Sequence, residues 1–351
     1  MTPRAACALP LPLPTTTAAG TVSPPAAQPV AALQEQLAEA LTGNGRALAA
    51  LPGASSVDRR DEFLTLLAVY DLHTAPLEQV GDTARFQHHP AVAAVKSRLE
   101  AGWLDQLELA WLGAGHLAEA TTAERAVTAM RSVAARDRLP EAYKWLAKDA
   151  SWPELVEFLA LEGGPDGGFD DLVSACQVGL SGSAKVELAQ NYWDEMGNGD
   201  PAAVHTVLHN ELVAAIAMPR VPREQLPVAA LERAALGGLL ATNRWLQPEM
   251  LGALGLLELQ AGPRCRLVLQ AFNRLGAPAA AYPFYLEHAE VDPRHGKDWL
   301  EKAVGPTVAK YPGWGPRIVK GAWWRSTINL AFFQGLHRQL IAPQDQTLSA
   351  A

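Results

Sequence analysis

Apolar residues recur at helical spacing along most of the chain, and this periodicity constrains the fold more than any other feature of the sequence. Leu33, Leu37 and Leu41 show the pattern near the N-terminus, while segments that alternate strictly between apolar and polar residues are hard to find. The pattern predicts an all-α protein built as a compact helical bundle. The expected helices span residues 90–113, 122–135, 151–162, 170–196, 201–217, 227–245, 248–260, 263–275, 278–309 with a break, and 316–338.

The composition is that of a globular protein with an acidic balance of charge. The 351 residues are 49% hydrophobic and 19% charged, and 29 Lys and Arg stand against 37 Asp and Glu, which gives a net charge of −8. Such a chain lacks the basic footprint of a nucleic-acid binder, so we expect a small-molecule substrate and no nucleic-acid partner. Charged and polar residues interrupt even the most apolar stretch, which predicts no membrane-spanning segment and no membrane partner.

The cysteines and the N-terminal segment bear on the compartment. Cys7, Cys176 and Cys265 have spacings that fit neither a disulfide framework nor a CxxC metal site. Prolines interrupt the apolar stretches at the start of the chain, where an export signal would need an unbroken one. We therefore expect a cytoplasmic protein. Residues 1–29 are rich in Pro, Ala and Thr and poor in large apolar side chains, which predicts a disordered arm.

The most informative motif is EHAEVDPRH, which holds His288, Asp292 and His295. Offsets of four and seven residues place these three side chains on one face of a helix, where they can converge on one point. The alternative is a solvated polar stripe, because the same turn carries further charged residues. Pro293 lies inside the motif and removes one amide donor, which predicts a local kink.

A second polar cluster lies in NYWDEMGNGDPAAVH. Glu195 ends one expected helix and His205 lies in the next, with the break Gly197–Gly199 between them. On an unbroken helix the two side chains would point to different faces, so the break is what allows them to meet. Asp200 and Pro201 are interpreted as the N-cap and first residue of the second helix. Taken alone, a helix C-terminus of this composition is more often an ordinary loop than part of a site.

The third piece is Glu258, a lone carboxylate in the apolar run MLGALGLLELQAG. Burial of an unpaired charge there would cost several kcal/mol, so a cation, a bound proton or exposure on the polar face of the helix must account for it. Together the three segments supply three imidazoles and three carboxylates. This mixture suits Fe(II) or Mn(II) and is the ligand set of a non-haem di-iron site, whereas structural zinc favours cysteine and magnesium takes few histidines.

At these residues the sequence resembles the haem-oxygenase-like di-iron oxidases, also described as iron-containing redox enzymes. The resemblance runs from about Ser151 to Gln339 and implies a haem-oxygenase-like helical bundle with an added N-terminal helical region. It implies that two Fe(II) ions, with Fe/Mn as the alternative, act with O2 as co-substrate. The metal ligands it implies are Glu195, His205, Glu258, His288, Asp292 and His295. Some relatives have one more carboxylate ligand, for which Glu162 and Asp170 are the candidates.

The resemblance also implies a division of the chain and a class of reaction. We expect a helical region at 30–115, a di-iron core at 116–340 and a flexible tail at 341–351. The region at 30–115 is either an added layer or a dimerisation element, and we expect a homodimer. The implied reaction is N-oxygenation or oxidative C–C cleavage of a small organic substrate, for which an amino-acid-derived compound is one candidate.

Residues next to the ligands are candidates to orient them, because metal-bound imidazoles usually donate their second N–H to a polar group. These candidates are Asn191, Asp194, Glu287 and Asp298. Two other classes of function stay open. One is a metal-free, thiaminase-like hydrolase on the same fold with Cys176 or Cys265 as nucleophile, although nothing in the local sequence activates either thiol. The other is a non-enzymatic helical binding protein.

Overall fold

The structure of the chain is a computed structural model, which describes residues 33–43, 57–163 and 168–348. Helices fill most of these residues and no strand occurs among them, so the prediction of an all-α fold is confirmed. All of the described residues belong to one compact unit, Ala32–Ala351. The predicted arm at 1–29 lies outside the described residues.

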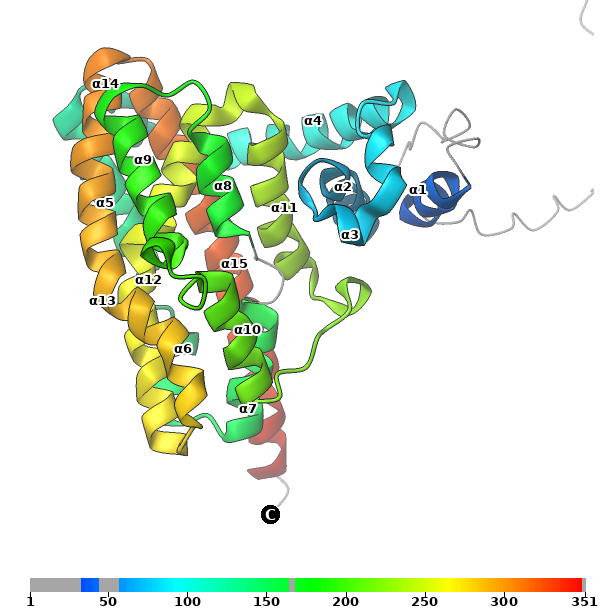
Figure 1. Ribbon diagram of the computed structural model, residues 1–351, viewed down its shortest axis with the longest axis vertical. Helices are drawn as coiled ribbons and strands as arrows, with labels where there is room; N and C mark the ends of the chain where they lie inside the picture. The colour runs from blue at the N-terminus through cyan, green and yellow to red at the C-terminus, as the bar shows by residue number, and fades with distance from the viewer. Residues whose placement is uncertain (1–32, 44–56, 164–167, 349–351) are drawn as a thin grey trace, which may run out of the picture. The chain divides into compact units, whose positions relative to one another are not determined.

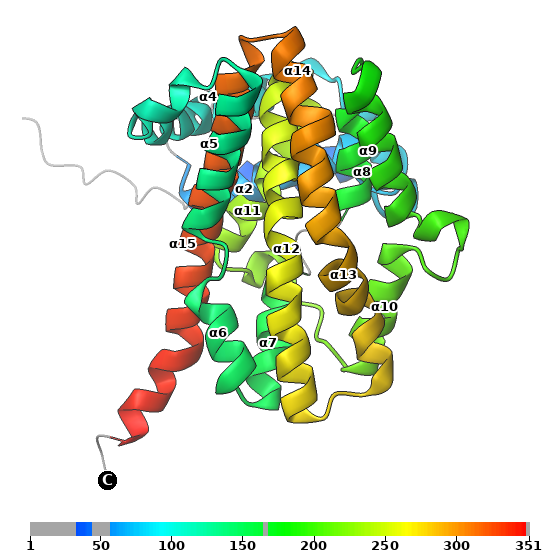
Figure 2. The same cartoon turned by 90° about the vertical axis from the view of Figure 1, so that its left-hand side faces the viewer.

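The bundle is organised around α12 (Gln247–Leu275), which is buried on most of its circumference. Helices α13 (Tyr282–Asp298) and α15 (Trp314–Leu348) pack along it on either side (Figure 2). A central helix covered by neighbours must be apolar all round. This explains why Glu258 stands out in its sequence.

Figure 1 shows the remaining helices, of which α1, α2 and α3 lie beyond α11, to one side of this centre. Their bounds are α1 Leu33–Thr42, α2 Arg59–Thr74, α3 Leu77–Val80, α4 Pro90–Leu112, α5 Ala123–Arg136, α6 Glu141–Lys148, α7 Trp152–Glu162, α8 Phe169–Cys176, α9 Gly182–Glu195, α10 His205–Ala215, α11 Val228–Thr242 and α14 Gly305–Lys310. A π-helical segment, Trp299–Val304, joins α13 to α14.

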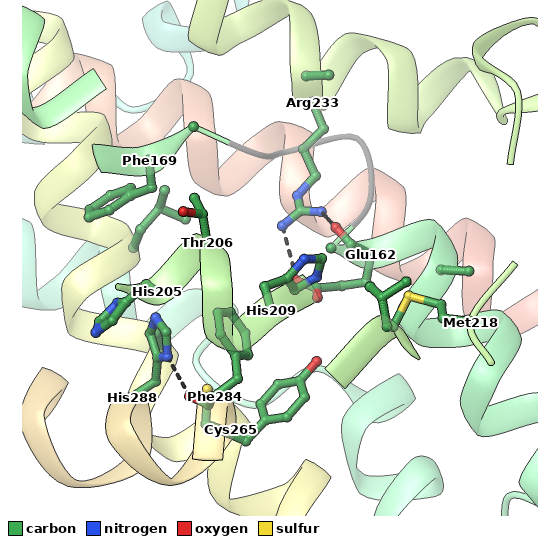
Figure 3. A pocket seen from close by; sticks show the side chains of 18 of the residues that line it. Glu162, Phe169, His205, Thr206, His209, Met218, Arg233, Cys265, Phe284 and His288 are labelled. Carbon is green, nitrogen blue, oxygen red and sulfur yellow. Dashed lines mark hydrogen bonds and ion pairs between the residues drawn. The ribbon is translucent and has the colours of Figure 1, made fainter. Parts of the chain in front are cut away.

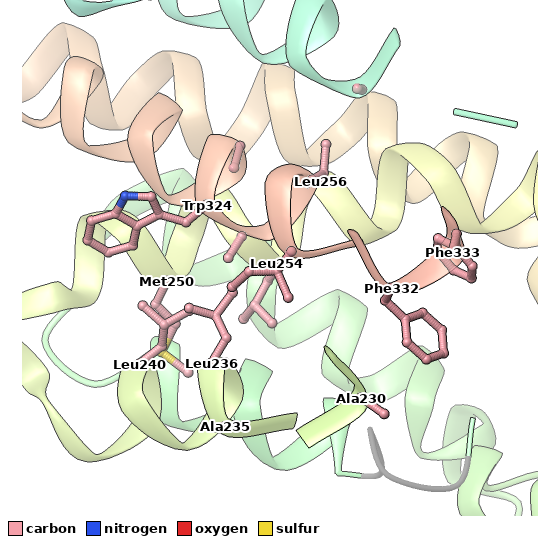
Figure 4. Close-up of a cluster of buried hydrophobic side chains, with 14 of the residues drawn as sticks. Ala230, Ala235, Leu236, Leu240, Met250, Leu254, Leu256, Trp324, Phe332 and Phe333 are labelled. Atoms are coloured by element: carbon pink, nitrogen blue, oxygen red, sulfur yellow. The ribbon is translucent and has the colours of Figure 1, made fainter. Parts of the chain in front are cut away.

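The apolar core forms where α11, α12 and α15 face one another. Leu236 and Leu240 of α11 and Met250 of α12 are all nearly inaccessible to solvent, as is Trp324 of α15 (Figure 4). The Trp324 indole N–H donates to the carbonyl of Leu107 at 3.1 Å, which also ties α15 to α4. Large aromatic side chains with a satisfied polar atom contribute strongly to such cores.

Helices α12 and α13 approach each other closely because glycine lies at their contact. A Cβ on Gly296 would lie 3.0 Å from the carbonyl oxygen of Glu258 and 3.1 Å from the Cα of Leu259. On α12, a Cβ on Gly262 would lie 3.0 Å from the ring of Pro293. Because these two positions have no side chain, the backbone of α12 at Glu258 can approach the backbone of α13 closely.

Helix α13 continues through Pro293 up to Asp298. Proline has no amide hydrogen, so the carbonyl of Ala289, four residues earlier, loses its helical partner. The guanidinium of Arg266 on α12 donates to this carbonyl at 2.8 Å. A side chain of the neighbouring helix thus replaces the missing hydrogen bond.

Several predicted helix boundaries are wrong. The expected helices 248–260 and 263–275 are a single helix, α12, which continues through Pro263. The expected helix 170–196 is interrupted between α8 and α9, where Gly179 and Gly182 adopt positive φ angles. Asp200 does not cap a helix at Pro201. Its carboxylate accepts from the amide of Ala202 within a turn, and α10 starts at His205.

A capping box starts α7, where Glu154 accepts from the Ser151 amide at 2.7 Å, as the spacing of Ser151 and Glu154 in the sequence predicts. Of the described helices, none combines the length and the apolar character that crossing a bilayer requires.

Candidate metal centre

The structure brings the six predicted ligands together as two groups of three. The first triad is Glu195, His205 and His288, and the second triad is Glu258, Asp292 and His295. Within each triad one potential ligand atom from every residue lies within 4.8 Å of the others. The ligands come from α9, α10, α12 and α13. His288 and Asp292 lie one turn apart on α13, a rise of about 6 Å, which makes the two triads neighbours.

In the first triad, Glu195 Oε2 lies 2.6 Å from His205 Nδ1, and both side chains are buried. The rings of His205 and His288 are 4.6 Å apart between centroids. His288 Nδ1 lies 2.7 Å from the carbonyl oxygen of Phe284. A carbonyl can only accept, so Nδ1 carries the proton and Nε2 presents its lone pair to the triad.

The turn between α9 and α10 carries Glu195 and His205 to the same place. Gly197, Asn198 and Gly199 have φ angles of 61°, 54° and 90°, a left-handed run that favours glycine. A Cβ on Gly197 would lie 2.5 Å from the carbonyl carbon of Ala203. A side chain at Gly197 would obstruct this turn. Glycine is therefore what allows the chain to reverse where the sequence suggested it.

In the second triad, His295 Nδ1 lies 3.5 Å from Glu258 Oε2 and 3.7 Å from Asp292 Oδ1. All three side chains are buried. The other ring nitrogen, Nε2, lies 2.8 Å from Asp194 Oδ2. In the neutral ring a carboxylate there holds the proton on Nε2, so Nδ1, which faces Glu258 and Asp292, is the nitrogen that can bind a metal.

Two of the four residues that were expected to orient ligands make such contacts. Besides the Asp194 carboxylate on His295, the Asn191 amide donates to Glu258 Oε1 at 2.8 Å. Asp298 instead forms an ion pair with Lys302 at 2.7 Å. Glu287 makes no hydrogen bond or ion pair with the described residues, and acts on the site only through its charge.

Crowding of acidic groups perturbs the ionisation of the site. Burial, together with the charges of Glu258 and Glu195, raises the pKa of Asp292 well above its usual value. Burial would lower the pKa of His295, but Glu258 and Asp194 outweigh it and raise the pKa to about 9. Burial and the neighbouring His205 lower the pKa of His288. The site thus contains more negative charge than its neighbouring cationic groups neutralise. A bound cation would neutralise this excess.

The donor atoms also fit a pair of metal ions. Glu258 Oε2 and His295 Nδ1 are buried and have no hydrogen-bond partner in the described part of the chain. The same is true of His205 Nδ1, whose short contact with Glu195 is not aligned as a hydrogen bond. Metal–ligand bonds of about 2.1 Å put neighbouring donors of one ion roughly 3 to 3.5 Å apart. The spacings in the second triad are close to this.

A cavity of about 620 Å³ reaches the site (Figure 3). Five of the six triad residues line it, all except His295. Phe284 lies beside His288, with ring centroids 4.4 Å apart, and His209 packs edge-on against Phe284 at 5.1 Å. A small organic molecule therefore has room next to both triads.

The two candidates for an additional ligand, Glu162 and Asp170, line this cavity but belong to neither triad. Glu162 Oε1 forms an ion pair with Arg233 at 3.1 Å (Figure 3). Burial, with the charges of Asp171 and Glu195 adding to it, raises the pKa of Asp170. Of the two candidates, Asp170 is therefore the one whose pKa is affected by the charge of a first-triad residue, Glu195.

The two described cysteines are buried. Burial raises the pKa of Cys176 to about 12 and that of Cys265 well above its usual value. Cys265 lines the cavity, while Cys176 does not. A thiol with a raised pKa is a poor nucleophile at neutral pH.

The cavity residues that had no place among the sequence predictions include Tyr143, Arg233 and Tyr285. Tyr285 could have been found, because it lies three residues before His288 and so shares its helical face. Tyr143 and Arg233 come from helices α6 and α11, which carry no ligand. No local pattern marks such residues.

A comparison with known families supports this description. The profile of a family described as iron-containing redox enzymes matches residues 156–329, a segment that contains all six triad residues. No curated protein matches the chain. On the strength of the family match, the chain belongs to the family of iron-containing redox enzymes.

Proposed function

We propose that this protein is a non-haem di-iron oxygenase or oxidase that uses O2 to oxidise a small organic substrate. The observation that carries the proposal is the sorting of three imidazoles and three carboxylates into two buried, adjacent triads beside a cavity. Either triad alone would fit one mononuclear site. Two triads that share helix α13 fit a pair of ions.

The first ion would be held by Glu195, His205 and His288, and the second by Glu258, Asp292 and His295. Three carboxylates and three neutral imidazoles carry a charge of −3, which leaves a net positive charge with two divalent ions. Two ferrous ions, when bound, supply electrons for the reduction of O2. N-oxygenation and oxidative C–C cleavage are the reactions proposed, on a substrate for which an amino-acid derivative is one candidate.

The protein's own groups prepare the site for this chemistry. Phe284 O holds the proton on His288 Nδ1, and the Asp194 carboxylate holds the proton on His295 Nε2. Each imidazole is thereby fixed in the tautomer that presents a lone pair to its triad. The Asn191 amide fixes the Glu258 carboxylate. Phe284 covers one side of the site and limits access of water.

The main rival is a metal-free hydrolase with a cysteine nucleophile. The raised pKa values of Cys176 and Cys265 and the absence of Cys176 from the cavity lining disfavour it. A purely structural or binding role would not explain why both triads contain buried ligand atoms that lack a hydrogen-bond partner. We also propose a cytoplasmic homodimer.

The test is metal content. Purified protein reconstituted with Fe(II) under anaerobic conditions should hold close to two irons per chain, and mixing with O2 should produce a transient visible absorption band. The double variant His288→Ala, His295→Ala should lose both. The control His73→Ala removes an imidazole of α2 and should keep both irons. Full iron loading in the double variant would refute the ligand assignment.

A further inference from the structure

A second, smaller cavity of about 60 Å³ lies where α8, α11, α12 and α15 meet. Four of its lining side chains are the buried Leu236 and Leu240 of α11 and Met250 and Leu254 of α12 (Figure 4). Apart from Arg325 of α15, its lining residues are apolar. This apolar pocket is distinct from the larger cavity that reaches the triads.

The charged lining residue does not make the apolar pocket a good site for water. Arg325 is buried, and its Nη1 donates to the carbonyl of Arg233 at 3.1 Å. A buried water usually makes about three hydrogen bonds to polar groups, whereas a cavity lined by hydrocarbon stays dry and binds apolar molecules. The lining of the apolar pocket therefore favours an apolar occupant over water.

The apolar pocket adjoins the larger cavity. Phe169 of α8 (Figure 3) and Leu257 of α12 line both of them. Leu257 directly precedes the candidate ligand Glu258, and Leu254 lies one turn before Glu258, a rise of about 6 Å along the helix axis. The two cavities are therefore separated by single side chains close to the second triad.

The size of the apolar pocket limits what can occupy it. Its volume of about 60 Å³ is less than half of the roughly 150 Å³ of an engineered apolar cavity that binds benzene or xenon. A ring or a branched chain does not fit in this space, whereas an atomic or diatomic gas does. Transfer of such a gas from water to apolar surroundings is favourable. Of the reactants in the proposed function, O2 is the small apolar one.

A glycine leaves the apolar pocket open at its outer end. Gly237 of α11 and Leu172 of α8 both line it and are only half-buried, which places this end between the two helices. A Cβ on Gly237 would lie 3.4 Å from Leu172 Cδ1. A longer side chain at position 237 would therefore fill the space between α8 and α11.

We propose that the apolar pocket is a binding site for a small apolar gas, and that O2 passes through it from between α8 and α11 to the triads, crossing at Phe169 and Leu257. By this route O2 can arrive while an organic substrate occupies the larger cavity. The inference deepens the proposed oxidase function and rests on it for the use of O2. The affinity of the apolar pocket for a gas does not depend on that function.

The first measurement uses xenon as an apolar probe and methionine methyl groups as NMR reporters, on the purified full-length protein without metal. Met250 lines the apolar pocket, Met218 lines the larger cavity, and Met130 of α5 is buried and lines neither. Xenon pressure should shift the signal of the Met250 methyl group saturably. The signal of Met130 should not shift saturably, and that of Met218 should shift only at higher pressure.

Variants connect xenon binding to the apolar pocket. Gly237→Leu should fill the pocket and abolish the xenon response of Met250. Gly102→Leu is the matched control, because Gly102 of α4 is exposed and nothing lies within 4 Å of a Cβ there. It should keep the response. Gly237→Ala adds one methyl group against Leu172 and should weaken the xenon response in a folded protein, even if Gly237→Leu disturbs the packing of α8.

The second measurement is the reaction of the Fe(II)-loaded protein with O2. The second-order rate constant should fall at least about tenfold in Gly237→Leu, while the iron content stays at the wild-type value. Gly102→Leu should react like the wild type. Loss of xenon binding in Gly237→Leu with an unchanged rate constant would overturn the O2 route.

The absence of a saturable xenon shift at Met250, or equal shifts at Met250, Met218 and Met130, would overturn the gas site. These outcomes are separable from failure of the oxidase proposal. A protein that holds two irons and reacts with O2 but shows no xenon shift at Met250 would remove the gas site alone. A saturable shift at Met250 in a protein that holds no iron would remove the oxidase and the O2 route, and keep the gas site.

Discussion

At the scale of single residues, hydrogen bonds outside the triads decide which nitrogen each imidazole offers. His288 is bonded through Nδ1 to a backbone carbonyl and His295 through Nε2 to the Asp194 carboxylate. The two rings thus present opposite nitrogens to their triads although they share one helix face. Glu258 and Asp194 together make His295 the more basic of the two. Metal binding at the second triad should therefore depend more on the Asp194 carboxylate than metal binding at the first triad depends on the Phe284 carbonyl.

Asp194→Asn tests this dependence. The amide no longer offers a charged acceptor to His295 Nε2, so we expect iron affinity at the second triad to fall about 10- to 100-fold, with the first triad much less affected. Stepwise Fe(II) titration measures the two affinities. Asp298→Asn is the matched control because Asp298 pairs with Lys302 instead. Equal losses in both variants would mean that the contact with His295 has no special role.

The pKa of His295 predicts how the metal-free protein responds to pH. Its folded value, about 9, exceeds the reference value of 6.5. Protonated His295 therefore stabilises the fold fully below pH 6.5, and this stabilisation is lost as the pH rises through 9. It amounts to at most about 3 kcal/mol.

The measurement compares chelator-treated wild type with His295→Gln by chemical unfolding. Their difference in unfolding free energy should shrink between pH 6.5 and 9, since other titrating groups largely cancel. A difference that stays constant over this range would show that His295 is not the proton acceptor.

The residue types and spacings were enough to predict the six members of the triads, because His288, Asp292 and His295 share a helix face and Glu258 interrupts an apolar run. Their division into triads could not be predicted. His288 and His295 belong to different triads, and only the position of α9 and α12 relative to α13 decides this. Tyr143 was beyond prediction for the same reason, since it reaches the cavity from a helix without ligands.

At the scale of elements, two backbone features hold the ligand helices in place: the turn at Gly197–Gly199 and the glycine contact between α12 and α13. Sequence patterns indicated the first, because the Gly-Asn-Gly segment interrupts a helix. They gave no sign that α12 would continue through Pro263, since a proline in a buried helix is tolerated only when neighbours compensate for it. Tertiary packing overrode the local signal.

Gly197→Ala should damage the turn twice. The residue has φ of 61°, and its new Cβ would lie 2.5 Å from the Ala203 carbonyl carbon. We expect a loss of roughly 2 kcal/mol or more in unfolding free energy and weaker iron binding at the first triad. Gly182→Ala is the control, because φ there is 65° but nothing lies within 4 Å. It should cost about 1 kcal/mol and spare the metal site. Equal costs would contradict the steric argument.

Gly296→Ala tests the contact between α12 and α13. The added methyl group would press on the backbone of Glu258 and Leu259, so the helices must move apart or distort, at a cost of about 1 to 3 kcal/mol. Iron loss at the second triad should accompany it. In α4, Gly102 has open space around it, and Gly102→Ala should be neutral or slightly stabilising. Thermal unfolding of both variants, with iron analysis, measures the contrast.

At the scale of the described unit, the N-terminal helices take part in the cavity. Leu67 of α2 lines it directly. The segment between α10 and α11 also lines it and is attached to α2, where Arg223 pairs with Asp71 and Arg60 donates to the carbonyl of Glu224 at 2.9 Å. Helix α2, which lies in the region at 30–115, therefore contributes to the cavity lining and supports a second segment of it, whatever the region's part in dimerisation.

Asp71→Asn should loosen this attachment without unfolding the protein. Arg223 and Asp71 are partly exposed, at 37% and 23% of their side chains, so their ion pair should contribute at most about 1 kcal/mol to global stability. Local opening is a different quantity from global unfolding. Amide hydrogen exchange in residues 216–227 should accelerate, because this segment has no helix of its own beyond one short 3₁₀ turn, Arg223–Gln225.

The control is Glu141→Gln, which removes the charge from an exposed ion pair with Lys144, and neither of these two residues lines the cavity. Its exchange in residues 216–227 should match the wild type. If Asp71→Asn leaves exchange in that segment unchanged, α2 does not hold it. If exchange accelerates across α10 and α11 as well, the ion pair supports the bundle as a whole. Only acceleration confined to the segment shows that the N-terminal helices shape access to the two triads.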